Sequence, residues 1–164
     1  MQMMPANGDD LAAAERIVEI GYPAVTPVMR DMVNWMRVAK SPVADAFAAF
    51  FGRLGPSAVG AINQGLMREN CWMRHRIFTQ ILPQWPPDAV RQLTSTLTIV
   101  ATQPDAYDND IRCVEILAQH RLTDLKWLVQ WLTFKKERWT VRNDLLLRVE
   151  ETLKSVQQSL GGDA

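Results

Sequence analysis

Three aspartates lie in one polar stretch, residues 102–110, and closely spaced carboxylates are the groups that bind calcium in proteins. Asp105, Asp108 and Asp110 follow the spacing Asp-x-x-Asp-x-Asp. An EF-hand loop also needs a glycine and a distal bidentate glutamate, and this stretch has neither at the required place. We therefore favour a polar loop in which Asp108 caps the following helix. Two alternatives stay open: a cation site, and an acidic tip through which Asp105 and Asp108 contact a basic partner.

The two histidines and two cysteines show no spacing typical of catalysis or metal binding. Arg74, His75 and Arg76 are the polar residues of the helix expected over 70–82, and His120 precedes Arg121 at an expected helix end, so each imidazole is expected to be solvated or to cap a helix. Cys71 and Cys113 are expected as buried small hydrophobic residues in a reducing compartment. The chain also lacks Gly-x-Ser-x-Gly, His-Glu-x-x-His and glycine-rich phosphate loops. The sequence therefore predicts no enzyme activity, no cofactor and no metal.

The tryptophans are the stronger signal for a binding surface. Trp127 and Trp131 are four residues apart, so on a helix they share one face. The neighbouring positions Leu125, Leu128, Val129 and Leu132 can serve the core, which places the tryptophans at its edge. Basic residues surround the pair, namely Lys126, Lys135, Lys136 and Arg138, and residues 125–140 carry a net charge of +3. One interpretation is core and rim packing with lysine stems over the rings. The other is an aromatic and basic surface for an acidic partner or for stacked bases.

Composition excludes strong charge-driven binding. The 18 basic and 18 acidic side chains of this 164-residue chain cancel, so no net charge attracts nucleic acid or an anionic membrane. Residues 1–8 lack the basic and apolar regions of a secretory signal. No apolar run approaches the roughly 18 residues of a membrane span. We expect a cytoplasmic protein with one domain, residues 1–164, whose ends 1–8 and 161–164 are frayed.

A repeated motif predicts the architecture. Gly21-Tyr22-Pro23-Ala24-Val25 recurs 34 residues later as Gly55-Pro56-Ser57-Ala58-Val59, and looser copies begin near Pro86 and Thr123. Each clear copy combines a glycine that ends one helix with a proline-containing turn that starts the next. A period of roughly 30 to 40 residues without strands is typical of stacked helical hairpins.

The apolar spacing along the chain is consistent with that architecture. Helices are expected at about 10–20, 23–37, 42–54, 57–66, 70–82, 89–101, 111–120, 124–132 and 140–156. Asp9 or Asp10, Ser41, Ser57, Glu69 or Asn70, Asp88, Asp108 and Asp124 are expected at their starts. Threonines in 89–101 make a strand the local alternative, and the 3–4 apolar spacing favours a helix. The expected fold is all-α: an α-solenoid of about four hairpins plus a C-terminal capping helix.

The same residues carry a family resemblance. Ala12-Ala13-Ala14-Glu15, the segment 21–27, Asn34-Trp35, the segment 41–44, Leu54-Gly55 and the segment 69–72 resemble a small bacterial family of HEAT/armadillo-like proteins of unknown function. The resemblance covers roughly residues 9–100. It implies a HEAT-like α-solenoid and no particular reaction. In size and organisation such solenoids resemble immunity proteins that neutralise toxins in bacterial competition, which is an analogy of fold.

Taken together, these features predict a protein-binding module whose partner is a toxin or secreted effector that it occludes. The alternatives are a nucleic-acid-binding protein similar to HEAT-like DNA glycosylases, and a homodimeric scaffold. The expected partner-binding residues are Asn34, Trp35, Asn63, Arg68, Asp105, Asp108, Lys126, Trp127, Gln130, Trp131, Arg138 and Trp139.

Overall fold

The structure is a computed structural model that describes residues 4–103, 105–138 and 143–161. Every regular element in these ranges is helical and none is a strand, which confirms the all-α class. Within the same ranges, no helix has both the length and the apolar character needed to cross a membrane. The chain divides into two compact units, Met1–Val90 and Arg91–Ala164. The expected single domain stays a prediction.

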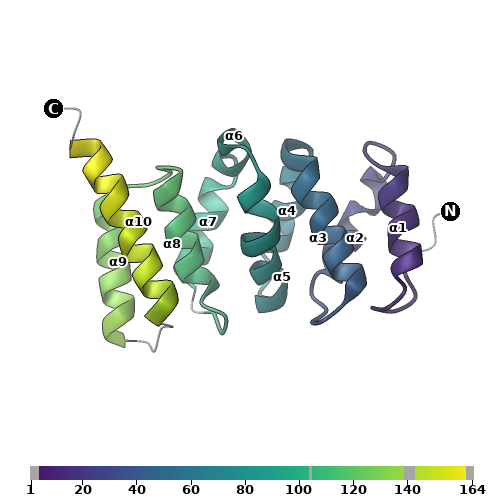
Figure 1. The fold of residues 1–164 in the computed structure, drawn as a ribbon, viewed down its shortest axis with the longest axis horizontal. Coiled ribbons are helices and arrows are strands. Elements are labelled where there is room, and N and C mark those ends of the chain that lie inside the picture. Colours follow the sequence, from purple (N-terminus) through teal and green to yellow (C-terminus); the bar gives the residue numbers. More distant parts are fainter. Residues whose placement is uncertain (1–3, 104, 139–142, 162–164) are drawn as a thin grey trace. The chain divides into compact units, whose positions relative to one another are not determined.

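Unit 1 is built from short helices that pack around α3. Its elements are α1 (Leu11–Ile20), α2 (Met29–Trp35), α3 (Pro42–Leu54), α4 (Val59–Leu66), α5 (Cys71–Arg76), a π-helical turn (Ile77–Ile81) and most of α6 (Pro87–Arg91), joined in part by 3-10 turns at Thr26–Val28, Gly55–Ala58 and Leu82–Gln84. Helix α3 contacts α1, α2 and the π-helical turn, and α2 also contacts α4 (Figure 1).

Helix ends in unit 1 follow the predicted chemistry at five positions. The side chains of Asp10, Ser41 and Asn70 accept hydrogen bonds from backbone amides in the first turns of α1, α3 and α5. Gly21 and Gly55 end α1 and α3 with φ angles of 70° and 60°, a region that favours glycine because it has no Cβ. The repeated motif is therefore a helix stop, as the sequence predicted.

The second half of the motif differs from its prediction. The helix expected over 23–37 begins only at Met29, after turns and a 3-10 segment, because the residues before it include Pro23 and Pro27, which have no N–H to donate. Ser57 was expected to cap α4, and that prediction is wrong. It lies inside the 3-10 turn, and Ala58 occupies the N-cap position.

The helix expected over 89–101 is also divided. It forms α6 and, in unit 2, α7 (Thr94–Ala101), with a non-helical step at 92–93. Asp88 lies in the first turn of α6 and does not precede it as a cap. The Thr94 hydroxyl donates to the Arg91 carbonyl at 2.6 Å, a local bond that competes with helix continuation. The helical prediction for the threonine-rich segment 94–101 is confirmed.

The core of unit 1 is aromatic, aliphatic and methionine-rich. Its largest fully buried side chains are Ile17, Met32, Met36, Phe47, Phe51, Ile62, Leu66, Met73, Ile77 and Ile81. A Cβ added to Gly65 of α4 would come within 2.9 Å of Val33 Cγ1, so glycine permits the close approach of α4 to α2. The buried Trp85 indole donates to the Phe51 carbonyl at 3.0 Å. Helix α2, which carries Trp35, is therefore packed against the largely buried helix α3.

Unit 2 is organised around α8 (Asn109–Gln119), most of which is buried. Helix α8 contacts α7, α9 (Leu125–Arg138) and α10 (Asn143–Gly161), and the last two run antiparallel (Figure 1). Glu115 of α8 accepts two hydrogen bonds of 2.7 Å from the Arg148 guanidinium of α10, a bidentate pair that fixes α10 on α8.

Candidate functional site

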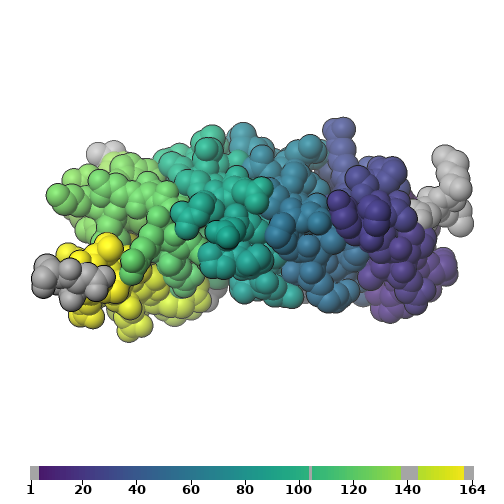
Figure 2. Space-filling model, turned by 90° about the horizontal axis from the view of Figure 1, so that it is seen from above, coloured from purple at the N-terminus to yellow at the C-terminus, as the bar shows by residue number. Residues whose placement is uncertain are grey.

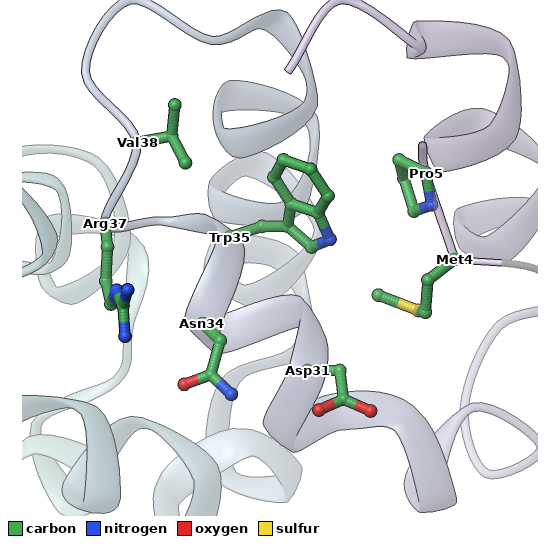
Figure 3. Close-up of a pocket in the computed structure, with 7 residues that line it drawn as sticks. All are labelled: Met4, Pro5, Asp31, Asn34, Trp35, Arg37 and Val38. Atoms are coloured by element: carbon green, nitrogen blue, oxygen red, sulfur yellow. The ribbon is translucent and has the colours of Figure 1, made fainter. Parts of the chain in front are cut away.

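A pocket of about 380 Å³ lies beside the C-terminal end of α2 in unit 1, and we call it the Trp35 pocket. Its lining residues are Met4, Pro5, Asp31, Asn34, Trp35, Arg37 and Val38. Figure 3 shows the half-buried Trp35 side chain across the pocket from Pro5 and Met4, with the nitrogen-bearing edge of its indole on their side. The structure thus places two predicted residues, Asn34 and Trp35, in one concave site.

A buried arginine holds the turn that carries this pocket. Arg76 at the end of α5 is 5% exposed. Its Nη1 donates to the carbonyls of Met36 and Val38 at 3.0 and 2.8 Å, and its Nε donates to Asp45 at 3.0 Å. The guanidinium therefore joins three segments and positions the residues that follow Trp35.

The sequence had suggested that Arg74 and Arg76 lie on the polar side of their helix. Arg74 is in fact 3% exposed and donates to the Leu66 carbonyl.

The opposite wall of the Trp35 pocket is fixed by the segment before α1. The Ser41 hydroxyl and the Val43 amide both bond to the Gly8 carbonyl, at 2.9 and 3.2 Å. The Ala6 amide donates to Asp10 at 3.0 Å. These bonds join Gly8 to the start of α3 and Ala6 to Asp10. The expectation that residues 1–8 are frayed stays a prediction. Met4 and Pro5 were not predicted as site residues, because no local pattern indicates that they meet residues some 30 positions away.

Unit 2 has a second concave site, of about 620 Å³, which we call the end groove. It is lined by Asp124, Leu125, Lys126, Val129 and Gln130 at the start of α9, and by Gln157 and Leu160 at the end of α10. In Figure 2 these ends of α9, in green, and α10, in yellow, both reach the visible surface. Two predicted residues, Lys126 and Gln130, are brought together here. Val129 had been assigned to the core, and it is instead 43% exposed.

The tryptophan pair forms an aromatic row along another face of α9. The Trp127 and Trp131 rings stack at 6.5 Å between centroids, and Trp131 stacks on Phe134 at 5.2 Å. Both tryptophans are half-buried, as expected for the edge of the core. The Trp131 indole donates to the Ala101 carbonyl at 2.6 Å, so this ring fixes α9 to the end of α7. That arrangement favours the rim-packing interpretation for Trp131.

The acidic stretch folds inward in part. Asp110 is fully buried and forms an ion pair with Lys135 of α9, which is 3% exposed. Lys135 was predicted on the exposed basic surface, and that prediction is wrong. Burial lowers the pKa of Lys135 from its ordinary value, and the Asp108 and Asp105 carboxylates oppose this shift. A buried, paired lysine is part of the interior and leaves the basic surface with one cation fewer.

Asp105 and Asp108 are half-buried beside this pair. Asp105 accepts hydrogen bonds from the Tyr107 amide and the Asn109 side chain at 2.8 and 2.9 Å, so it organises its own loop. Asp108 occupies the N-cap position of α8 with a left-handed φ of 53° and no side-chain capping bond. Neither residue lines the Trp35 pocket or the end groove. Their role in binding a basic partner stays a prediction.

The remaining predicted residues are dispersed. Asn63 and Arg68 are half-buried, in and just after α4, and they line neither concave site. Arg138 is the last residue of α9, and its side chain is outside the described part of the chain, as is Trp139. Four of the predicted residues therefore lie in the two concave sites, two in each unit, and the other described ones line neither site.

In the described ranges, histidine and cysteine belong to no metal-binding cluster. No group of three or more His, Cys, Asp or Glu side chains there is arranged to hold a metal ion. Cys113 is buried as expected, and Cys71 is only half-buried. His120 follows α8 at its C-cap, and His75 is half-buried within α5.

The environment of His120 predicts that the free energy of unfolding depends on pH. Burial, with a smaller effect from Arg91, lowers its pKa below the ordinary value of 6.5. The unfolded chain therefore binds a proton more readily than the folded chain, so the free energy of unfolding falls as pH drops through 6.5 toward the folded pKa. Urea titrations at several pH values between neutral and mildly acidic should show this fall. It should be smaller in His120→Gln and in Arg91→Gln. Equal slopes in all three proteins would contradict the assignment.

No protein-family model, no curated protein and no solved structure matches this chain.

Proposed function

We propose that the chain is a protein-binding module whose partner inserts an apolar side chain into the end groove. The observation that carries the proposal is the pair of apolar side chains, Val129 and Leu160, that remain 43% and 52% exposed in a concave site. Apolar side chains grouped in a groove with polar neighbours are typical of a protein interaction surface.

The apolar stripe of α10 explains why this groove is open. Val149 and Leu153 lie on one helical stripe with Leu160, and they are 0% and 5% exposed against the rest of unit 2. Leu160 continues the stripe beyond the point where other helices cover it. Burying an apolar side chain of this size contributes about 1.5–3 kcal/mol, so a partner that covers Leu160 and Val129 gains a central anchor.

The charges around the groove indicate the partner's character. Lys126 is exposed at its edge, whereas the Asp124 side chain already accepts a hydrogen bond from the Lys126 amide at 2.7 Å. Lys136, further along α9, is paired with Glu150. A partner segment that carries an apolar side chain next to an acidic residue would complement this site, because its carboxylate can pair with the Lys126 ammonium at the rim of the groove.

From the sequence we propose, more specifically, that the helices form a HEAT-like solenoid in the cytoplasm. We also propose that the partner is a bacterial toxin or secreted effector, which the chain neutralises by occlusion. The support is the repeated helix stop, with Gly21 and Gly55 both at positive φ and 34 residues apart, together with the analogy to small immunity solenoids. Small-angle X-ray scattering is the direct test of a solenoid arrangement.

Disrupting the groove should abolish partner binding. The test is affinity purification of the tagged chain from the organism that encodes it, comparing wild type with Val129→Glu/Leu160→Glu. We expect a stoichiometric protein to be retained by wild type and reduced at least about tenfold by the double variant, because glutamates would place unpaired charge where apolar surface is buried. The recovered protein is then tested for toxicity, and for neutralisation by the chain.

Leu147→Glu is the matched control. Leu147 is a leucine of α10 that is 60% exposed and lies outside the end groove. It should retain the partner as wild type does. Loss from Leu147→Glu as well, or recovery of no stoichiometric protein, would contradict the proposal. Recovery that is abolished by nuclease treatment would instead support the nucleic-acid alternative.

A further inference from the structure

The Trp35 pocket is rich in groups that attract cations. Its lining includes the Trp35 indole, the Met4 thioether and the Asp31 carboxylate. Among the described residues Asp31 has no hydrogen bond or ion pair that would neutralise it. Asp31 and Trp35 are four residues apart on α2, so they lie on the same side of the helix.

Among the described lining residues Arg37 is the one cation, and its side chain lies away from Trp35 and Asp31 (Figure 3). In Figure 3 the Arg37 side chain turns away from Trp35, and Asn34 lies between it and Asp31. No solvent reaches Asn34 Oδ1, and it has no hydrogen-bond partner among the described residues. Rotating the amide exchanges its oxygen and nitrogen, so Asn34 can present an acceptor to a ligand on the Asp31 side.

We propose that the Trp35 pocket binds a cationic side chain, a lysine or an arginine, on the surface of the protein partner. The inference rests on the proposed protein-binding function and specifies the chemistry of a second contact. The aliphatic stem of such a side chain would lie along Pro5, Met4 and Val38. Its charged end would meet the Trp35 ring and the Asp31 carboxylate.

The size and exposure of the pocket admit a long side chain as the occupant. Its volume of about 380 Å³ lies at the small end of the range of roughly 300–1,000 Å³ for ligand pockets. Val38 at its edge is 40% exposed, so a group carried on another protein can reach it. The Arg76 bonds hold the wall at Met36 and Val38, and the Gly8 bond anchors the segment that follows Met4 and Pro5, which limits the ordering that binding requires.

The test uses small probes and needs no partner. The ¹⁵N-labelled chain is titrated with N-acetyl-lysine N-methylamide and with N-acetyl-arginine N-methylamide, and the Trp35 indole signal is assigned with Trp35→Phe. N-acetyl-citrulline N-methylamide, a neutral isostere of the arginine probe, is titrated in parallel. We expect saturable shifts of the Trp35 indole signal by the cations with dissociation constants in the millimolar range. The neutral probe should bind at least about threefold more weakly.

Two variants separate the pocket from general charge effects. Asp31→Asn should weaken binding of both cations at least about threefold without changing the neutral probe. Glu15→Gln removes a carboxylate from an exposed residue of unit 1 outside the pocket, and it should leave every titration unchanged.

Some outcomes overturn the inference. They are equal binding of citrulline and arginine probes, equal effects of Asp31→Asn and Glu15→Gln, or the absence of saturable shifts. Because the readout is a small-molecule titration in unit 1, it is independent of the end-groove purification. Failure of either experiment is thus distinguishable from failure of the other.

Discussion

Replacing Lys135 by methionine is expected to lower the free energy of unfolding by about 3–5 kcal/mol. The reason is that Asp110, which is 0% exposed, would keep a carboxylate in the interior without its ion-pair partner. A charge buried in a medium of low polarity is far less stable than the same charge in water. Urea unfolding at neutral pH, followed by far-UV circular dichroism, measures the change directly because the described structure is helical.

Two further variants make the Lys135 prediction specific. Asp110→Asn/Lys135→Met removes both charges, so it should recover most of the stability lost in Lys135→Met. Lys136→Met removes the neighbouring lysine, whose ion pair with Glu150 joins side chains that are 42% and 29% exposed, and it should cost less than about 1 kcal/mol. If the two single variants were equally stable, the pair between Asp110 and Lys135 would not be the buried interaction described above.

Replacing Arg76 by alanine is expected to lower the free energy of unfolding by about 3 kcal/mol. The variant leaves the carbonyls of Met36 and Val38 without the donor that satisfies them in a largely buried site. It also releases the turn that follows Trp35, so the Trp35 indole signal in a ¹⁵N spectrum should shift or broaden. The combination of lower stability and an altered Trp35 environment is the expected signature of a residue that positions the pocket.

The partner of Arg76 provides the control. Asp45 has a side chain that is 58% exposed, so Asp45→Asn should cost less than about 1 kcal/mol and leave the Trp35 signal in place. Arg76→Lys should fall between the two, because one ammonium cannot reproduce the planar donor arrangement that joins three segments. Equal losses in Arg76→Ala and Asp45→Asn would show that the ion pair, and not the two carbonyls, is the important contact.

Much of the local structure of this chain was predictable because it depends on neighbouring residues. Asp10, Ser41 and Asn70 cap helices, and Gly21 and Gly55 end them, through bonds and dihedral angles set within a few positions. Trp127 and Trp131 share a face because a helix places residues four apart together.

The helix boundaries that differ from the sequence predictions lie where two local effects oppose each other, namely the apolar spacing of a helix and residues that interrupt its backbone hydrogen bonds. The repeated motif predicted a helix from 23, yet α2 begins at Met29, because Pro23 and Pro27 withhold the amides that an α-helix needs. The threonines of 94–101 did form a helix, but the Thr94 hydroxyl bond to the Arg91 carbonyl accompanies a break just before it. Hydrophobic spacing alone does not locate such breaks, since it describes which face is apolar and not where the backbone changes conformation.

The all-α class, the caps of α1, α3 and α5, and the residues that can share a helical face follow from the amino-acid sequence alone. Which charged residues are inside depends on contacts between distant parts of the chain. In the sequence, Arg76 and Lys135 look like members of exposed basic clusters. Each is buried against a partner at least 25 positions away in the chain: Arg76 bonds to the Met36 and Val38 carbonyls, and Lys135 pairs with Asp110. The two concave sites were hidden for the same reason. Met4 and Trp35 line one site, and Leu160 and Val129 the other, only after the chain folds, and no local sequence pattern indicates proximity over that range.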